Sequence, residues 1–206
     1  MMREIRIYFE GDRKLRLGLG NFLSSVRERA KLRNIHWNLV ASGPRSRAYR
    51  DFVDALSQHP NAFNILLVDA EEPVVHSPWE HLHRRKEDGW ARPGAGDDQC
   101  HLMVQMMETW FLADVPALKD YYGNEFNENA IPKAGDIEGI EKKKIESALD
   151  EATRKTNKGK YHKTHHAPDL LSKVNVEKVR KAAPACERLY KVLNNWIDSE
   201  ASNSDG

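Results

Sequence analysis

Acidic side chains follow two segments that have the pattern of β-strands. Glu10 comes directly after the alternating segment from Glu4 to Phe9, and Asp69 and Glu71 follow an apolar run that starts at Phe63. The carboxyl ends of parallel strands share one edge of a sheet, where open sheets bind their ligands. Hard oxygen ligands there suit Mg²⁺ or Mn²⁺, which generate hydroxide and stabilise charge on phosphoryl oxygens. We expect Asp69 and Glu71 to hold such an ion and Glu10 to be a ligand or a general base. The alternative is that each caps a turn or loop.

Glu108 is a candidate for a second metal site. If a strand ends at Val104, Glu108 lies in the first turn of the next helix, near the same sheet edge. The alternative is an exposed acid that satisfies the helix N-terminus.

Basic residues that can contact phosphate lie in two places. Lys158, His162 and Lys163 belong to a basic and aromatic cluster between predicted helices, and Arg45 follows the end of the second strand. Lysine holds phosphate as a point charge, and histidine can protonate a leaving group near neutral pH. The alternatives are a flexible basic loop and, for Arg45, a surface charge at a helix start. A zinc site at the histidines is disfavoured because no cysteine lies nearby.

Strand and helix patterns alternate in the N-terminal half, which predicts a three-layer α/β fold with right-handed crossovers around a mostly parallel sheet. The strands are expected at 4–9, 36–41, 63–68 and 101–104, and the helices at 15–33, 46–57, 106–113, 136–154, 168–174 and 176–197. One continuous helix from Gln99 fits the fourth strand's segment nearly as well. The segment 70–98, rich in Pro, Gly and Trp, has little periodicity and is expected to be a long functional loop or a small insertion.

The chain of 206 residues fits one domain. We expect an α/β core at 1–135, a helical extension packed on it at 136–197, and a disordered tail at 198–206. The net charge is only +1, but residues 1–50 and 141–181 carry +8 and +6 and residues 51–140 carry −11. This layout predicts a cationic groove for nucleic acid around a carboxylate cluster, although charge runs on helices are commonly solvated faces.

Several classes of protein are disfavoured by the sequence. The apolar runs are far shorter than a membrane helix needs, the N-terminus has no apolar signal core, and two cysteines cannot build a disulfide framework. A cytoplasmic location is expected. Gly18-x-Gly20 lies inside a helix pattern and not after a strand, so it is not a dinucleotide motif. No phosphate-loop or G-x-S-x-G motif is present, so ATP chemistry would belong to a partner.

The strand-Glu10-Gly11 and strand-Asp69-Ala70-Glu71 patterns resemble the topoisomerase-primase (Toprim) catalytic domain. More specifically, the chain is similar to a bacterial family, number 4276 among the domains of unknown function, from Ile5 to about Leu193. The longest shared block runs from Asp97 to Asp114, and another spans Lys158 to Lys163. The resemblance implies a Toprim-like fold and a gene beside ATPases in phage-defence or restriction loci. Because the shared text reaches Lys163, it favours phosphate contact there.

Two positions depart from the Toprim pattern. Glu71 replaces the second Asp with a longer arm that can still ligate a metal, and Asp12-Arg13 replaces an expected glycine-rich turn. Asp12 can add a ligand or compete for the metal, and Arg13 is placed to contact phosphate.

The sequence therefore predicts a Mg²⁺-dependent nuclease of antiviral defence that works with a separate ATPase, and an oligomer within a complex is compatible with this prediction. The main alternative is a non-catalytic adaptor whose aromatic-rich loop from Pro73 to Pro93 docks an ATPase while its basic face holds nucleic acid.

Overall fold

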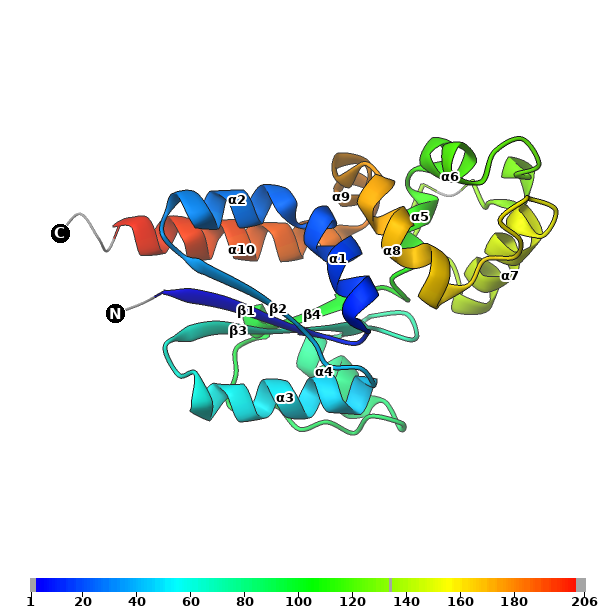
Figure 1. Cartoon of the computed structure of the whole chain (residues 1–206). Coiled ribbons are helices and arrows are strands. Elements are labelled where there is room, and N and C mark those ends of the chain that lie inside the picture. The colour runs from blue at the N-terminus through cyan, green and yellow to red at the C-terminus, as the bar shows by residue number, and fades with distance from the viewer. Residues whose placement is uncertain (1–2, 134, 203–206) are drawn as a thin grey trace.

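A four-stranded parallel sheet forms the centre of the protein. The computed structural model describes residues 3–133 and 135–202. The strands are β1 (Glu4–Phe9), β2 (His36–Ala41), β3 (Ala62–Asp69) and β4 (Cys100–Met103), in the order β2-β1-β3-β4. Helices cover both faces of the sheet (Figure 1). The expected three-layer α/β architecture is confirmed, including the fourth strand, and it is consistent with a Toprim-like fold.

The alternation of side chains along the strands divides the core into two layers. Ile5, Ile7 and Leu67 lie in one hydrophobic cluster, while Tyr8 and Leu66 lie in the other. The first layer contains α1, α2 and α10, and the second contains α3 and α4 (Figure 1). The bounds of these helices are α1 (Arg13–Phe22), α2 (Ser24–Leu32), α3 (Arg45–Gln58), α4 (Pro78–Arg84) and α10 (Pro184–Ser202).

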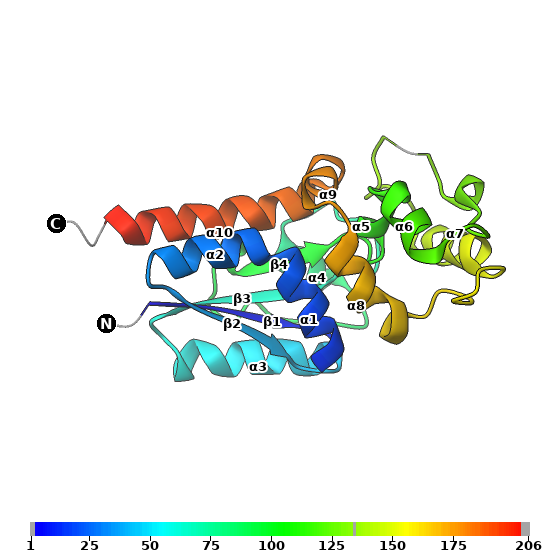
Figure 2. The same ribbon diagram turned by 45° about the horizontal axis from the view of Figure 1, so that its top comes forward.

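A group of helices lies beyond the carboxyl ends of the strands (Figures 1 and 2). It comprises α5 (Thr109–Leu112), α6 (Val115–Tyr122) and α7 (Lys142–Thr153), and we call it the helical lobe. From this lobe α8 (Lys163–Lys173) returns along α1, and α9 (Val176–Ala182) leads into α10. The lobe and α8 bring residues far along the chain to the carboxyl edge of the sheet.

The close approach of α1 and α8 depends on a glycine. A Cβ atom at Gly18 would lie 2.7 Å from the Cα atom of Pro168 and closer still to its carbonyl oxygen. Asn21 continues this contact by donating a hydrogen bond of 3.0 Å to Ser172. Gly18 is therefore a packing residue between helices, in agreement with the rejection of a dinucleotide motif.

Several helix boundaries differ from the sequence-based expectation. The helix expected at 15–33 is two helices, because Leu23 leaves helical geometry between them. α5 is shorter than the segment expected at 106–113. Asp136 does not start α7: it accepts hydrogen bonds from the backbone of Glu138 and Gly139 in a turn, and the helix begins at Lys142.

The C-terminal half also differs. α8 begins at Lys163, earlier than the expected residue 168, and includes Pro168. α10 continues to Ser202, so residues 198–202 of the expected tail are helical, while 203–206 lie outside the described residues. Leu189 and Leu193 of α10 belong to the same core as the strands, so this helix completes a layer of the α/β fold.

The segment 70–98 uses its aromatic side chains internally. It contains α4, whose Trp79 is buried against Phe52, while Trp90 stacks on Tyr49 with ring centroids 4.5 Å apart. The adaptor hypothesis needed these aromatic groups for a partner, so this packing weakens it. Among the described helices, none is long and apolar enough to cross a membrane.

Candidate metal centre

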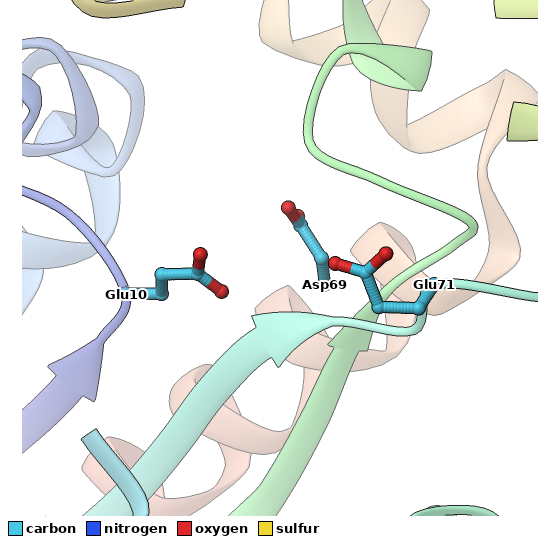
Figure 3. A group of neighbouring side chains, drawn as sticks. All are labelled: Glu10, Asp69 and Glu71. Atoms are coloured by element: carbon cyan, nitrogen blue, oxygen red, sulfur yellow. The ribbon is translucent and has the colours of Figure 1, made fainter. Parts of the chain in front are cut away.

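Three carboxylates meet at the carboxyl edge of the sheet. Glu10 follows β1, Asp69 ends β3 and Glu71 lies two residues beyond it, and one oxygen from each lies within 4.8 Å of the others. Figure 3 shows Glu10 reaching across from one strand end toward the two acids of the other. The parallel pairing of β1 with β3 places both strand ends together. The predicted convergence of Glu10, Asp69 and Glu71 is confirmed.

Asp69 is held by two donors. One carboxylate oxygen accepts a hydrogen bond of 2.7 Å from the backbone N–H of Met107, and the other lies 2.9 Å from the ammonium of Lys163. The side chain is almost fully buried. Asp69 therefore joins the sheet, the start of the lobe and the first turn of α8.

Glu71 has a strained backbone. Its φ is 71°, in the left-handed region that costs a non-glycine residue about 1–3 kcal/mol. Its N–H donates to the carbonyl of Gln105 at 2.6 Å, and the Gln105 side chain accepts a 3.0 Å hydrogen bond from the N–H of Lys142. The ammonium of Lys142 forms an ion pair with the Glu71 carboxylate. Gln105 thus positions both members of this pair.

Glu10 has an incomplete set of partners. Its Oε2 is buried and has no hydrogen-bond donor among the described residues. Burial raises the pKa of Glu10, the charge on Asp69 adds to this increase, and Lys163 and Arg45 oppose it. A buried carboxylate oxygen without a donor is costly unless a cation or proton compensates it.

Lys163 connects this cluster with Glu108. Its ammonium lies 3.7 Å from Oε2 of Glu108, and the hydroxyl of Tyr161 donates a 2.8 Å hydrogen bond to Oε1. Burial alone would lower the pKa of Lys163, but Asp69 and Glu108 outweigh it and raise the pKa. Burial also raises the pKa of Glu108, against the effect of Lys163.

Glu108 does not have the surroundings expected of a second metal ligand. It is 1% exposed, not a surface acid at a helix start, and it lies outside the group of acids that can share an ion. The contacts with Lys163 and Tyr161 hold the Glu108 carboxylate in place beside the three acids.

Arg45 is a positioning residue in this structure. Its guanidinium binds both oxygens of Asp88, at 2.9 and 2.8 Å, donates to the carbonyl of Asp69 and lies 5.0 Å from the centre of the Trp90 ring. These contacts engage three of the five N–H donors of Arg45, so its expected role as a phosphate clamp stays a prediction. Its charge still acts on Glu10.

The other predicted phosphate contacts lie on the outside of the molecule. Arg13 is exposed in the first turn of α1, where Asp12 is the N-cap and accepts a hydrogen bond from the N–H of Leu15. Asp12 lies outside the group of three acids that can share an ion. Lys158 lies over the ring of Tyr121, and His162 is an exposed N-cap of α8. Of the expected basic residues, Lys163 is the one that forms an ion pair with the carboxylates in the described structure.

The donor set fits a hard divalent cation. Three carboxylates supply oxygen ligands at matched strand ends, and the orphaned oxygen of Glu10 provides an unused acceptor. Mg²⁺ and Mn²⁺ prefer such ligands and retain waters in the remaining positions. Lys142 and Lys163 now balance two of the three charges, so a cation that binds here competes with the lysines.

Two residues of the site were not identified from the sequence. Lys142 stands in a run of three lysines at a helix start, a pattern typical of solvated charge, and nothing local distinguishes it from Lys143. Gln105 acts through its backbone carbonyl and its side chain on two distant segments, which only the tertiary structure brings together.

The chain belongs to the family described as Domain of unknown function (DUF4276), which it matches over residues 19–194. No curated protein and no solved structure shows significant similarity to the chain.

Proposed function

We propose that this member of the family is a Mg²⁺- or Mn²⁺-dependent phosphodiesterase that cleaves nucleic acid. The observation that carries the proposal is the convergence of Glu10, Asp69 and Glu71 within 4.8 Å, with the ammonium of Lys163 beside Asp69. Acidic oxygens next to a cationic side chain match the needs of phosphoryl transfer, which requires charge stabilisation and positioning.

A cavity of about 280 Å³ beside the carboxylates provides a place for the phosphate. Glu10 and Lys163 line it, together with Gly11 and with Thr164 in the first turn of α8. The N–H groups at the start of this helix and the lysine ammonium favour an anion there, against the acidic side chains of Glu10 and Asp12, which also line the cavity.

Each side chain has a distinct part in the proposed reaction. Asp69 and Glu71 hold the divalent cation, which when bound lowers the pKa of water and stabilises phosphoryl oxygens. Glu10 holds the cation or accepts the proton of the attacking water, and burial, which raises the pKa of Glu10, favours the second role. Lys163, which pairs with Asp69 in this structure, would hold a phosphate oxygen once a cation took its place beside Asp69.

The test is cleavage of plasmid DNA and of tRNA with Mg²⁺, with Mn²⁺ and with EDTA. Asp69→Asn keeps an acceptor for the N–H of Met107, so we expect a folded protein without metal-dependent cleavage. Glu10→Gln should lower the rate by about 10²- to 10⁴-fold if Glu10 is the base. Glu72→Gln is the matched control, because Glu72 is exposed and pairs with Arg85 outside the cluster.

Cleavage that survives in both cluster variants would reject the proposal, and it would point to a contaminating nuclease or another site. Cleavage should also require the separate ATPase if the family resemblance extends to its defence setting, so each variant is assayed with and without a neighbouring ATPase.

A non-catalytic adaptor is the second candidate. The pairing of Asp69 with Lys163 and of Glu71 with Lys142 favours it, since a cluster neutralised by lysines can be purely structural. Calorimetric titration separates the two candidates: the enzyme binds Mg²⁺ or Mn²⁺ in a way that Glu10→Gln weakens, whereas the adaptor binds nucleic acid or the ATPase without either ion.

A further inference from the structure

A second cavity borders the buried carboxylate of Glu108. It has a volume of about 360 Å³ and lies against α7. Oε1 of Glu108 accepts the hydrogen bond from Tyr161, whereas Oε2 is buried and has no hydrogen-bond donor, with Lys163 at 3.7 Å as its ion-pair partner. Glu108 thus lines this cavity and has one buried oxygen that lacks a donor, and the size of the cavity falls in the range of small-molecule sites, about 300–1,000 Å³.

The lining of this cavity selects the chemistry of a ligand. Met106, Leu149 and Tyr161 supply apolar and aromatic surface, and Glu146 and Asp150 add acidic groups. Among the described residues that line it, none has a basic side chain, so the cavity does not suit a phosphate. A flat aromatic ring with N–H groups on its edge can stack its faces on the aromatic and aliphatic surface and donate to the acceptors of this wall.

A metal ion is a poorer match than such a ring. Glu108, Glu146 and Asp150 do not form a group whose oxygens can surround one ion in the described structure, unlike the three acids at the strand ends. Asp150 is also engaged, because it forms an ion pair of 2.7 Å with Lys160.

We propose that the Glu108 cavity binds the guanine base next to the scissile phosphate of the nucleic-acid substrate. An ionised carboxylate only accepts hydrogen bonds, and guanine presents adjacent N–H donors on its Watson–Crick edge. Enzymes that act on extruded nucleotides read this edge by hydrogen bonding and stack the ring on aromatic groups. The inference rests on the proposed nuclease function, since Lys163 spans both Glu108 and the metal centre and so places the cavity beside the phosphate.

Binding of free guanosine tests the inference without catalysis. Guanosine has no phosphate, and the titration is made with the full chain in EDTA, followed by calorimetry or by NMR chemical shifts. We expect guanosine to bind more tightly than inosine, which lacks the 2-amino group, and uridine. Glu108→Gln retains an acceptor for Tyr161 but loses the charge, and it should weaken guanosine binding by at least about tenfold.

Glu151→Gln is the matched control, because Glu151 is an acid on the same helix that pairs with Arg154 and does not line this cavity. Unchanged binding in Glu108→Gln, equal binding of guanosine and uridine, or no nucleoside binding would each overturn the inference. The proposed function fails separately, by the absence of metal-dependent cleavage in a wild type that still binds guanosine.

Discussion

Two glycines of α1 give a matched test of how the core holds Lys163 at the site. A Cβ atom at Gly18 would meet the backbone of Pro168 in α8, with the Cα atom at 2.7 Å, whereas a Cβ atom at Gly20 would meet only the side chain of Leu39, at 3.6 Å. The second distance is an ordinary van der Waals contact. The two positions are both buried and both helical, so they differ mainly in this contact.

The expected magnitudes follow from two opposing effects. Replacing glycine by alanine within a helix gains about 1 kcal/mol of helix propensity. Overpacking a close contact costs about 1–3 kcal/mol, and the cost at Gly18 lies at the upper end because backbone atoms cannot rotate away. Gly18→Ala should therefore lower the free energy of unfolding by about 2 kcal/mol, while Gly20→Ala leaves it unchanged or raises it by up to about 1 kcal/mol.

Urea unfolding followed by circular dichroism measures both values. Gly18→Ala should also bind Mg²⁺ with higher affinity than the wild type, because displacement of α8 carries the competing ammonium of Lys163 away from Asp69. If Gly18→Ala proves as stable as Gly20→Ala, the close packing of α1 on α8 is not what positions the lysine, and this reasoning is refuted.

Three further variants test charged side chains at the site and elsewhere in the protein. Lys163→Met leaves Asp69 and Glu108 uncompensated and should cost about 2 kcal/mol in urea unfolding, partly recovered with Mg²⁺; stability equal to the wild type would contradict this. Burial raises the pKa of Glu138 to about 7 in the native state, against 4.5 in the unfolded state. Between these two values the native state holds a proton that the unfolded state has lost. The stability contribution of Glu138 is therefore lost as the pH rises from about 4.5 to about 7. Glu138→Gln should remove this slope and stabilise the protein at pH 8 by on the order of 1 kcal/mol, after allowance for solvent screening; an unchanged pH profile of melting temperature would exclude the effect. Arg45→Lys should cost about 1–2 kcal/mol in the same unfolding assay because lysine cannot bind both oxygens of Asp88, with the exposed Arg47→Lys as the neutral control; equal stability of the two would show that the bidentate pair is dispensable.

The carboxylate cluster was predictable because it depends on short-range pattern and one topological rule. The apolar run before Asp69 predicts a buried parallel strand, and the alternating segment before Glu10 predicts a second strand. Parallel strands linked by helices end at the same edge, so the three acids converge whatever the details of the connections.

The environment of the cluster was not predictable in the same way. Lys142 and Lys163 reach the acids from α7 and α8, more than 70 residues after Glu71 in the case of Lys142. Their partners depend on how the lobe packs, and no periodicity encodes that. The predicted start of α7 was wrong for a local reason. Asp136 is a residue type that commonly caps a helix, but its carboxylate accepts hydrogen bonds within a turn instead.

The two lysines and the carboxylates that they neutralise lie on different parts of the structure, so a bound cation would change how these parts are linked. The carboxylates belong to the sheet and the loop after β3, whereas the groups that neutralise them belong to α7 and α8. A divalent ion that binds Asp69 and Glu71 must replace both ion pairs, so it weakens two of the links between the sheet edge and these helices. Metal binding and the position of the helical lobe are therefore coupled, and reciprocally a ligand that holds the lobe away from the carboxylates must raise their affinity for the ion.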